Sequence, residues 1–242
     1  TTRPAVIFRN ESCLVKNINT NGWGGTTYGV INFRSTSKYS ELRGANVNGG
    51  SVQTIRGNTP FITISNVTSN GISVGIQFQN GYGLNISDSM FLSFNSAGIL
   101  LLNTTFSNGK NIVLVNSSGA TDSFSLDLNS SMNIVNSTYD KSLETVTTGS
   151  TIYRKWYFDA QANYSVSKLP VNGATVKAYN NTGALQFSTS TGADGKIVTQ
   201  ELIEYVNNGG TRTYYSNYTI NSTKGTETKT YSLNVTTNLF QQ

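Results

Sequence analysis

The feature that most constrains this chain is a short apolar repeat in its first 140 residues. The lead apolar residues of three similar segments are Leu42, Ile64 and Ile86, which are separated by two successive spacings of 22 residues. Leu14 precedes them after a longer interval. A fixed period of this length predicts a repeat architecture in which each unit buries its apolar side only against its neighbours.

Corners rich in Asn and Gly follow these segments, as at residues 17–22, 46–50, 66–71 and 103–109. Both residue types tolerate a positive φ, which a tight corner requires. Short strands with alternating apolar residues are predicted after the corners, at 29–33, 75–78, 98–102 and 123–128. Short strands joined by such corners predict a parallel β-helix, in which like Asn side chains stack in ladders from coil to coil.

On these repeats, residues 5–140 resemble the right-handed parallel β-helix repeats shared by pectate-lyase-like and NosD-like periplasmic and surface proteins. The repeat of that family reads roughly Ile-x-Asn-(Val/Ile)-x-x-Asn-Gly-Ile. The resemblance includes no catalytic motif.

The periodicity is lost over 139–151, which we interpret as a bridging stretch. Longer alternating strands are then predicted at 152–158, 174–179, 196–199, 214–220 and 230–236, with turns at Gly173, Gly183, Gly195 and Gly225. These strands indicate an antiparallel sandwich. The order of Pro170-x-x-Gly173-Ala-x-Val176 and then Thr191-x-x-Asp194-Gly195 resembles the carboxypeptidase-regulatory-like, immunoglobulin-type domain. In versions appended to archaeal surface proteins this module is a spacer, so the resemblance implies an archaeal source and no catalysis.

The predicted fold is therefore all-β, with a short right-handed parallel β-helix over 1–145 and an immunoglobulin-like β-sandwich over 146–242. Charged residues make up only 12% of the chain, so solubility must come from neutral polar groups or attached sugars. The start Thr1-Thr2-Arg3-Pro4 is expected to be a mature end left by processing. Twelve asparagines head an Asn-x-Ser/Thr sequon and are the predicted N-glycosylation sites: Asn10, Asn66, Asn85, Asn103, Asn116, Asn129, Asn136, Asn163, Asn180, Asn217, Asn221 and Asn234. The sequons, the low charge and the processed start together predict an extracellular glycoprotein.

The net charge of +5 is carried by scattered Lys and Arg residues, and only Arg154 and Lys155 are adjacent. Nucleic-acid binding needs a basic cluster or stripe and is not expected. No apolar run is long enough to cross a membrane.

Cys13 cannot pair within the chain because it is the only cysteine. It is interpreted either as a small buried hydrophobe or as a cysteine that pairs between subunits.

Enzyme chemistry finds little support in the sequence. The chain has twelve carboxylates and no histidine, and none of the carboxylates forms a pair at the spacing that a glycoside hydrolase needs. No catalytic residue, cofactor or metal is predicted. The best candidates for a weak cation site are Asp122 and Asp127 together with Glu201 and Glu204. The aromatics that could bind sugars or partner chains are Trp23, Tyr28, Trp156, Tyr157, Tyr214, Tyr215 and Tyr218, with packing inside the sandwich as the alternative.

The apolar strand Ala5–Phe8 begins close to the first residue, which leaves little room for a cap on the terminal coil. An uncapped coil is an open sheet edge. We therefore expect self-assembly into a filament, sheath or surface layer, through Ala5–Phe8 and the segment Leu233–Phe240. The alternatives are a glycan-binding or adhesive module of a larger surface protein and a polysaccharide-processing enzyme.

Overall fold

The computed structural model describes residues 6–20, 30–48, 53–70 and 73–241. The chain forms two compact units. Unit 1 comprises residues 1–152 and 207–211, and unit 2 comprises residues 153–206 and 212–242. No helix in the described part of the chain has the length and apolar character needed to cross a bilayer.

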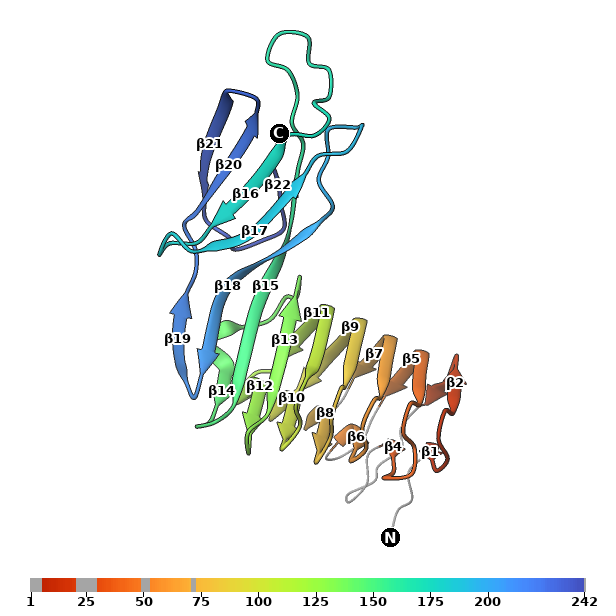
Figure 1. Cartoon of the computed structure of the whole chain (residues 1–242). Coiled ribbons are helices and arrows are strands. Elements are labelled where there is room, and N and C mark those ends of the chain that lie inside the picture. The colour runs from red at the N-terminus through yellow and green to blue at the C-terminus, as the bar shows by residue number, and fades with distance from the viewer. Residues whose placement is uncertain (1–5, 21–29, 49–52, 71–72, 242) are drawn as a thin grey trace. The chain divides into compact units, whose positions relative to one another are not determined.

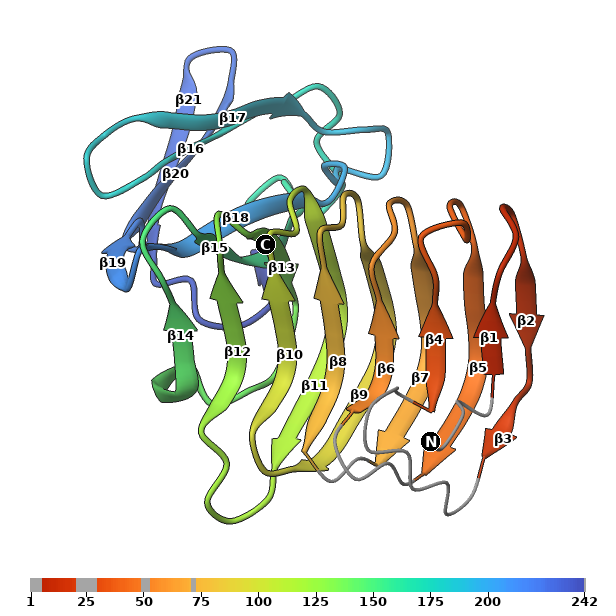
Figure 2. The same ribbon diagram turned by 90° about the horizontal axis from the view of Figure 1, so that it is seen from below.

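Unit 1 is a parallel β-solenoid of about six turns, in which two parallel sheets face one another across an apolar core (Figures 1 and 2). The first sheet consists, in spatial order, of β1 (Val6–Phe8), β4 (Ile31–Phe33), β6 (Gln53–Gly57), β8 (Val74–Gln79), β10 (Ala97–Leu102), β12 (Asp122–Asp127) and β14 (Glu144–Val146). The second contains β2 (Leu14–Lys16), β5 (Glu41–Asn48), β7 (Thr63–Asn70), β9 (Asn85–Phe94), β11 (Ser107–Asn116) and β13 (Ser131–Val135), with β3 (Asn19–Thr20) also paired to β5.

The predicted repeat is confirmed by the register of the second sheet. Leu42 pairs with Ile64, which pairs with Ile86, and all three side chains are buried. The assignment of Leu14 to this row is wrong by one residue, because Val15 is the partner of Leu42. Successive side chains of a strand point to opposite faces, so the one-residue shift leaves the Leu14 side chain 52% exposed.

The four predicted second strands correspond to β4, β8, β10 and β12. Their core positions align from coil to coil, with Ile76 opposite Ile99 and Ile99 opposite Phe124. Gly57 makes room for one large side chain in this core, because a Cβ at that position would lie 2.2 Å from the ring of Phe78.

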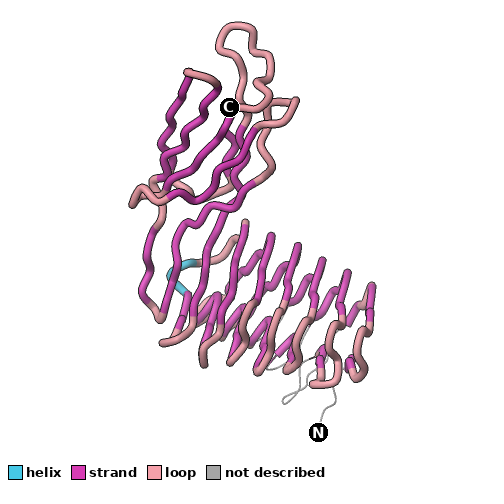
Figure 3. The backbone as a smooth tube through the Cα atoms, in the orientation of Figure 1, coloured by secondary structure: helices cyan, strands magenta, loops and turns pink. Residues whose placement is uncertain are grey.

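The interpretation of residues 139–151 as a bridging stretch is wrong. This segment contains the short 3-10 helix η1 (Lys141–Leu143), drawn in cyan in Figure 3, followed by β14. Strand β14 pairs with β12 and adds a further strand to the first sheet. The period was hidden in the sequence because β14 has only three residues and buries only Val146.

Unit 2 contains a four-stranded antiparallel sheet in the order β17 (Leu185–Ser190), β16 (Thr175–Tyr179), β20 (Tyr218–Lys224) and β21 (Glu227–Leu233). The strand β15 (Thr151–Ala160) lies between β18 (Gln200–Asn208) and β22 (Leu239–Gln241), and β18 also pairs with β19 (Thr211–Tyr214). The core contains Trp156, Phe158, Val176, Tyr218 and Ile220.

Three of the predicted strands of unit 2 correspond to β15, β16 and β21, and the glycines of all four predicted turns have a positive φ. The predicted strand at 196–199 is wrong, because Lys196 forms only an isolated bridge to Gln161. The predicted strand at 214–220 is divided between β19 and β20. Asn217, with φ of 44°, breaks the extended backbone between them.

Candidate functional site

Four aromatic side chains form an exposed row on unit 1, which we call the aromatic stripe. Its members are Tyr39, Phe61, Tyr82 and Phe106, which are between 39% and 63% exposed. Neighbouring ring centroids are 4.9, 5.4 and 4.8 Å apart along the row. The first two rings are stacked with an interplanar angle of 3°. Aromatic surface of this extent, ordered and facing solvent, is a feature of binding surfaces.

The backbone of the corners presents these rings at a conformational cost. Tyr39, Phe61 and Phe106 have φ values of 56°, 56° and 55°, a left-handed region that costs a bulky residue roughly 1–2 kcal/mol. Gly83 takes up this conformation in the remaining corner, where a Cβ would lie 2.9 Å from the Phe61 ring. Strained backbone that recurs at neighbouring sites supports the hypothesis that the stripe has a function.

Amide ladders lie on both sides of the stripe, because asparagines precede and follow its aromatic residues in the sequence. In the preceding ladder, Asn103 donates from Nδ2 to Oδ1 of Asn80 at 2.9 Å. In the following ladder, Asn108 donates to Asn85 at 3.1 Å, and Asn133 donates to Asn108 at 3.3 Å. The surface therefore combines apolar rings with amide groups at a regular spacing.

The predicted stacking of asparagine side chains from coil to coil is confirmed by a further ladder within the second sheet. Asn111 donates to the carboxylate of Asp88 at 2.6 Å, and Asn136 donates to Asn111 at 2.7 Å. All three residues have a positive φ. The register adds Asn66, Gly44 and Asn17 to the same row, each again with a positive φ. The predicted corners at 46–50 and 66–71 are wrong for residues 46–48 and 66–70, which belong to β5 and β7.

The aromatics singled out from the sequence are not the ones in the stripe. Trp23 and Tyr28 lie outside the described residues. Trp156 and Tyr218 are buried in the core of unit 2, whereas Tyr214 is 51% exposed. Tyr157 and Tyr215 are partly buried. Burial raises the pKa of Tyr218 to about 12, and its hydroxyl donates to the carbonyl of Ile203 at 2.9 Å.

Trp156 is part of a buried charged cluster in unit 2, which explains its position in the core. The Glu204 carboxylate accepts from the indole N–H of Trp156 at 2.7 Å and pairs with the Nε of Arg154 at 2.8 Å. The Arg154 guanidinium also lies 5.0 Å from the centroid of the Trp156 ring. A buried pair with this many partners is a structural arrangement, and it leaves Glu204 committed within the core.

The predicted cation-site candidates are divided between the two units. Asp122 and Asp127 belong to unit 1 and Glu201 and Glu204 to unit 2. Asp122 accepts from Thr145, while Glu201 pairs with Lys155 at 3.4 Å. The Thr147 hydroxyl, followed by the backbone N–H of Leu128, lowers the pKa of Asp127. Among the described residues no group of three or more His, Cys, Asp or Glu side chains is placed to hold a metal ion.

Eleven of the twelve carboxylates have a neighbouring donor or cation. This pattern gives the acids structural roles in corners, caps and ion pairs. The partners are Lys38 for Glu11, Arg43 for Glu41, Asn111 for Asp88, Thr145 for Asp122, Thr147 for Asp127, Ser142 for Asp140, Tyr139 for Glu144, Thr199 for Asp159, Lys196 for Asp194, Lys155 for Glu201 and Arg154 for Glu204.

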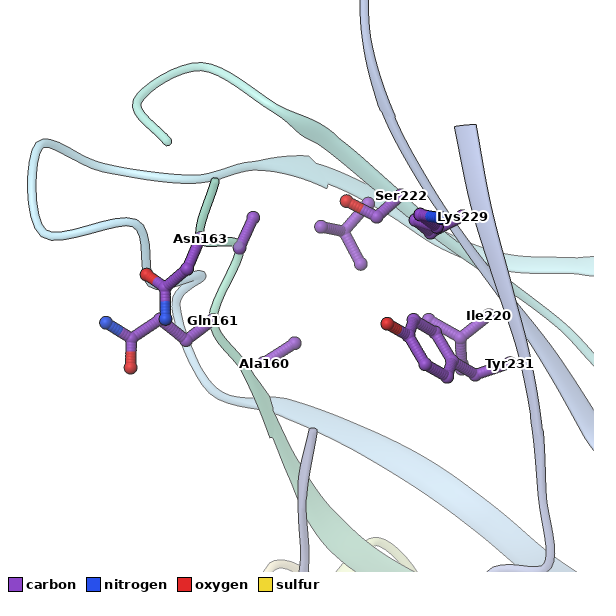
Figure 4. A pocket seen from close by; sticks show the side chains of 9 residues that line it. Ala160, Gln161, Asn163, Ile220, Ser222, Lys229 and Tyr231 are labelled. Atoms are coloured by element: carbon purple, nitrogen blue, oxygen red, sulfur yellow. The ribbon is translucent and has the colours of Figure 1, made fainter. Parts of the chain in front are cut away.

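A small open pocket lies in unit 2 (Figure 4). Its lining is apolar at Ala160, Val176 and Ile220 and carries polar groups from Gln161, Asn163, Ser222, Lys229 and Tyr231. Oδ1 of Asn163 is buried without a hydrogen-bond partner among the described residues. The lining holds one cation and no carboxylate, so the pocket offers no acid–base pair for hydrolysis.

Cys13 is partly buried and packs against the core of unit 1 as a free thiol, with its Sγ 3.2 Å from the carbonyl oxygen of Asn10. This placement favours the small-hydrophobe interpretation.

No family model matches the chain, and no curated protein matches it. Eight solved chains match it in structure. One is the enzymatically active domain of tailspike protein 2 of bacteriophage CBA120, with 11% sequence identity and a TM-score of 0.30. The match covers 91% of this chain and 55% of that chain, so this chain spans about half the length of the tailspike structure.

The aromatic stripe was missed because its residues lie outside the predicted strands where alternation was sought, and only Phe106 lies in a predicted corner. A signal was nevertheless present. The positions 39, 61, 82 and 106 are separated by 22, 21 and 24 residues, close to the period of the apolar repeat. A search for aromatic residues at the repeat period would have found the row.

Proposed function

We propose that this chain is a secreted, N-glycosylated structural protein that assembles into a filament, sheath or surface layer through its β edges. The observation that carries the proposal is the terminal strand β1. Among the described strands it pairs only with β4. An open edge of this kind is a template for a strand of another molecule.

The hydrogen bonds of β1 show which groups are available for such a contact. Val6 donates its N–H to Val30, and the carbonyl of Phe8 accepts from Arg34. Because the two edges of a strand alternate, the N–H and C=O of Ile7 point away from β4. The side chain of Phe8 is buried and stacks on Phe33 at 4.2 Å. The contact would therefore be made by the backbone of β1.

A second open edge occurs in unit 2. Within the described strands β21 pairs only with β20, and residues 227–232 are exposed. The segment Leu233–Phe240 is not one strand, because Leu233 ends β21 and Leu239 begins β22, which pairs with β15. We therefore assign the second contact to β21. Two different edges give a head-to-tail contact, which propagates into a filament when it does not close.

Microscopy and light scattering of purified protein test this assignment. Ile7→Pro removes the outward N–H of β1 and keeps both hydrogen bonds to β4, and it is expected to abolish polymers. Ile7→Ala keeps the N–H and serves as the matched control. Polymers that persist in Ile7→Pro, or monodisperse particles of the unaltered chain, would contradict assembly through β1.

A second function, glycan binding by an adhesive surface module, is favoured by the aromatic stripe. Its rings are exposed, recur at strand spacing and have amide ladders on both sides, a combination suited to the apolar faces and hydroxyl groups of a polysaccharide. Neutral chains fit best, because the four rings carry no charge.

Binding to neutral polysaccharides, measured by affinity electrophoresis, tests this second function. The double variant Phe61→Ser with Phe106→Ser removes two exposed rings and should reduce retardation at least tenfold. Tyr214→Ser removes an exposed ring outside the stripe and should leave binding unchanged. Equal retardation of both variants would exclude the stripe as the binding surface.

The absence of catalysis belongs to the proposal and is supported by the structural partners of the acids. A reducing-end assay on the same polysaccharides tests it, since release of sugar ends would overturn it. The right-handed coil, the immunoglobulin-like identity of unit 2 and an archaeal surface-protein origin are also proposed, on the repeat and turn patterns of the sequence.

A further inference from the structure

The geometry points to a division of eight of the twelve sequons into four structural asparagines and four glycan acceptors. This inference rests on the proposed extracellular glycoprotein. Transfer of a glycan from a lipid-linked pyrophosphate donor forms a bond between Asn Nδ2 and the anomeric carbon. The bond from that carbon to the pyrophosphate breaks, and Nδ2 loses one proton. The position of Nδ2 therefore decides which sequons can be acceptors in the folded chain.

The orientation of the ladder amides is fixed by acceptors that cannot donate. The Asp88 carboxylate only accepts when ionised, so Asn111 must turn Nδ2 toward it. Oδ1 of Asn111 then accepts from Nδ2 of Asn136, which heads a sequon. The Nδ2 of Asn136 is therefore held between two coils.

The ladder beside Tyr82 and Phe106 is fixed in the same way. Nδ2 of Asn85 donates to the carbonyl of Gly83 at 3.2 Å, so its Oδ1 faces Asn108 and accepts there. Nδ2 of Asn103, on the other side of the stripe, donates to Asn80. Asn85 and Asn103 both head sequons, and both nitrogens are engaged in structure.

A pyranose on a ladder nitrogen conflicts with the coil spacing. Neighbouring strands lie about 4.8 Å apart, so a sugar between two coils would separate them. Turning the amide outward would instead break the ladder hydrogen bond. We therefore assign Asn85, Asn103 and Asn136 to the structural group.

Asn180 joins the structural group for a different reason. It is 7% exposed, and its Oδ1 accepts from the N–H and hydroxyl of Thr182 and the N–H of Ala184. The hydroxyl of Thr182 is the sequon hydroxyl, and it is consumed by the same turn. Both parts of this sequon are therefore occupied by local structure.

The members of the acceptor group have exposed side chains, lie outside the ladder rows and donate no hydrogen bond from Nδ2 to any described residue. They are Asn10, Asn129, Asn217 and Asn234. None belongs to the ladders beside the stripe.

Site-by-site mass spectrometry tests the division. The chain is expressed in a eukaryotic secretory host that modifies sequons, and the folded, secreted monomer is isolated. Enzymatic release of glycans in heavy-oxygen water then marks each occupied asparagine as labelled aspartate. We expect labelling at Asn10, Asn129, Asn217 and Asn234 to exceed that at Asn85, Asn103, Asn136 and Asn180 at least tenfold. Comparable labelling of Asn85 or Asn103, or no labelling at any site, would overturn the division.

A matched pair of variants separates structure from poor recognition of the sequon. Asn103 and Asn234 both head sequons ending in threonine. Asn103→Gln should lower the melting temperature of unit 1 by several degrees, whereas Asn234→Gln should not change it. Equal melting of the two variants would contradict a structural role for Asn103. Protein from the native source that carries no glycan would instead refute the proposed glycoprotein and leave the host result standing.

Discussion

The two units of this chain arrange their interacting polar groups in opposite ways. In unit 1 the polar groups stack in rows, and each ladder hydrogen bond is repeated at the next coil, as for Asp88, Asn111 and Asn136. In unit 2 one cluster around Glu204 concentrates the buried charge. In unit 1, losing one ladder contact should lower the free energy of unfolding only modestly, because the same contact recurs in the other coils. In unit 2, losing one contact of the Glu204 cluster should lower it more, because no other contact replaces it. The following predictions test this difference, from the largest effect to the smallest.

Arg154→Ala should produce the largest loss, because it leaves the Glu204 carboxylate buried without its cation. The expected cost is about 3–5 kcal/mol in the free energy of unfolding of unit 2. Denaturant titration followed by tryptophan fluorescence measures it, since Trp156 lies in this cluster. Lys155→Ala removes a more exposed pair with Glu201 and should cost less than about 1 kcal/mol. Similar losses in both variants would refute the concentrated role of Glu204.

Asn111→Ala should cost about 3 kcal/mol in unit 1, because it removes two ladder hydrogen bonds and places Ala at a φ of 54°. Asn111→Gly removes the same bonds but tolerates the backbone, and it should cost about 1 kcal/mol less. Thermal unfolding followed by circular dichroism compares the two. If the Gly and Ala variants lose the same free energy of unfolding, the positive φ of residue 111 does not contribute to the loss.

Tyr218→Phe should cost about 1–2 kcal/mol at neutral pH, because the partly buried hydrogen bond from Tyr218 to the carbonyl of Ile203 is lost. The pKa of Tyr218 is raised from 10.0 to about 12 by burial. The folded state therefore keeps its proton where the unfolded state has lost it, and this stability is present below pH 10 and is lost as the pH rises toward 12. Stability measured between pH 9 and 12 should fall less steeply in Tyr218→Phe than in the unaltered chain.

Thr147→Val should have the smallest effect, which a carboxyl titration by NMR can detect. The Thr147 hydroxyl is the main cause of the lowered pKa of Asp127, so the variant should raise that pKa toward 3.8. Because a lowered pKa stabilises the folded state above the unfolded pKa, the unaltered chain loses this contribution as the pH falls below about 4. Asp140, whose pKa is lowered by Ser142, is the internal control and should not change.

The sequence predicted unit 1 better than unit 2 for a physical reason. Each coil of unit 1 needs an apolar residue at the same buried position. The recurrence of Leu42, Ile64 and Ile86 in the sequence therefore identified the register. The error at Leu14 shows the limit, since an apolar residue one position from its row looks identical in the sequence. Unit 2 has no repeat, and its strand β17 is too exposed to show an apolar pattern.

The candidate site was less predictable than the fold. The rings of the stripe are brought together by coil stacking, and their backbone lies in a conformation that the residue types Tyr and Phe do not signal. The buried partner of Trp156 is Glu204, 48 residues away, and nothing in the local sequence indicates that contact.

The common register of the coils makes the length of unit 1 a matter of counting. Ile86 and Gly109 occupy equivalent positions in consecutive coils, so removal of residues 86–108 would bring Ile64 beside Gly109 with every row still aligned. The solenoid would shorten by about 4.8 Å, the spacing of one strand. Duplication of the same segment would lengthen it by an equal step. Such a solenoid can become longer or shorter by whole coils while the packing within each coil stays the same.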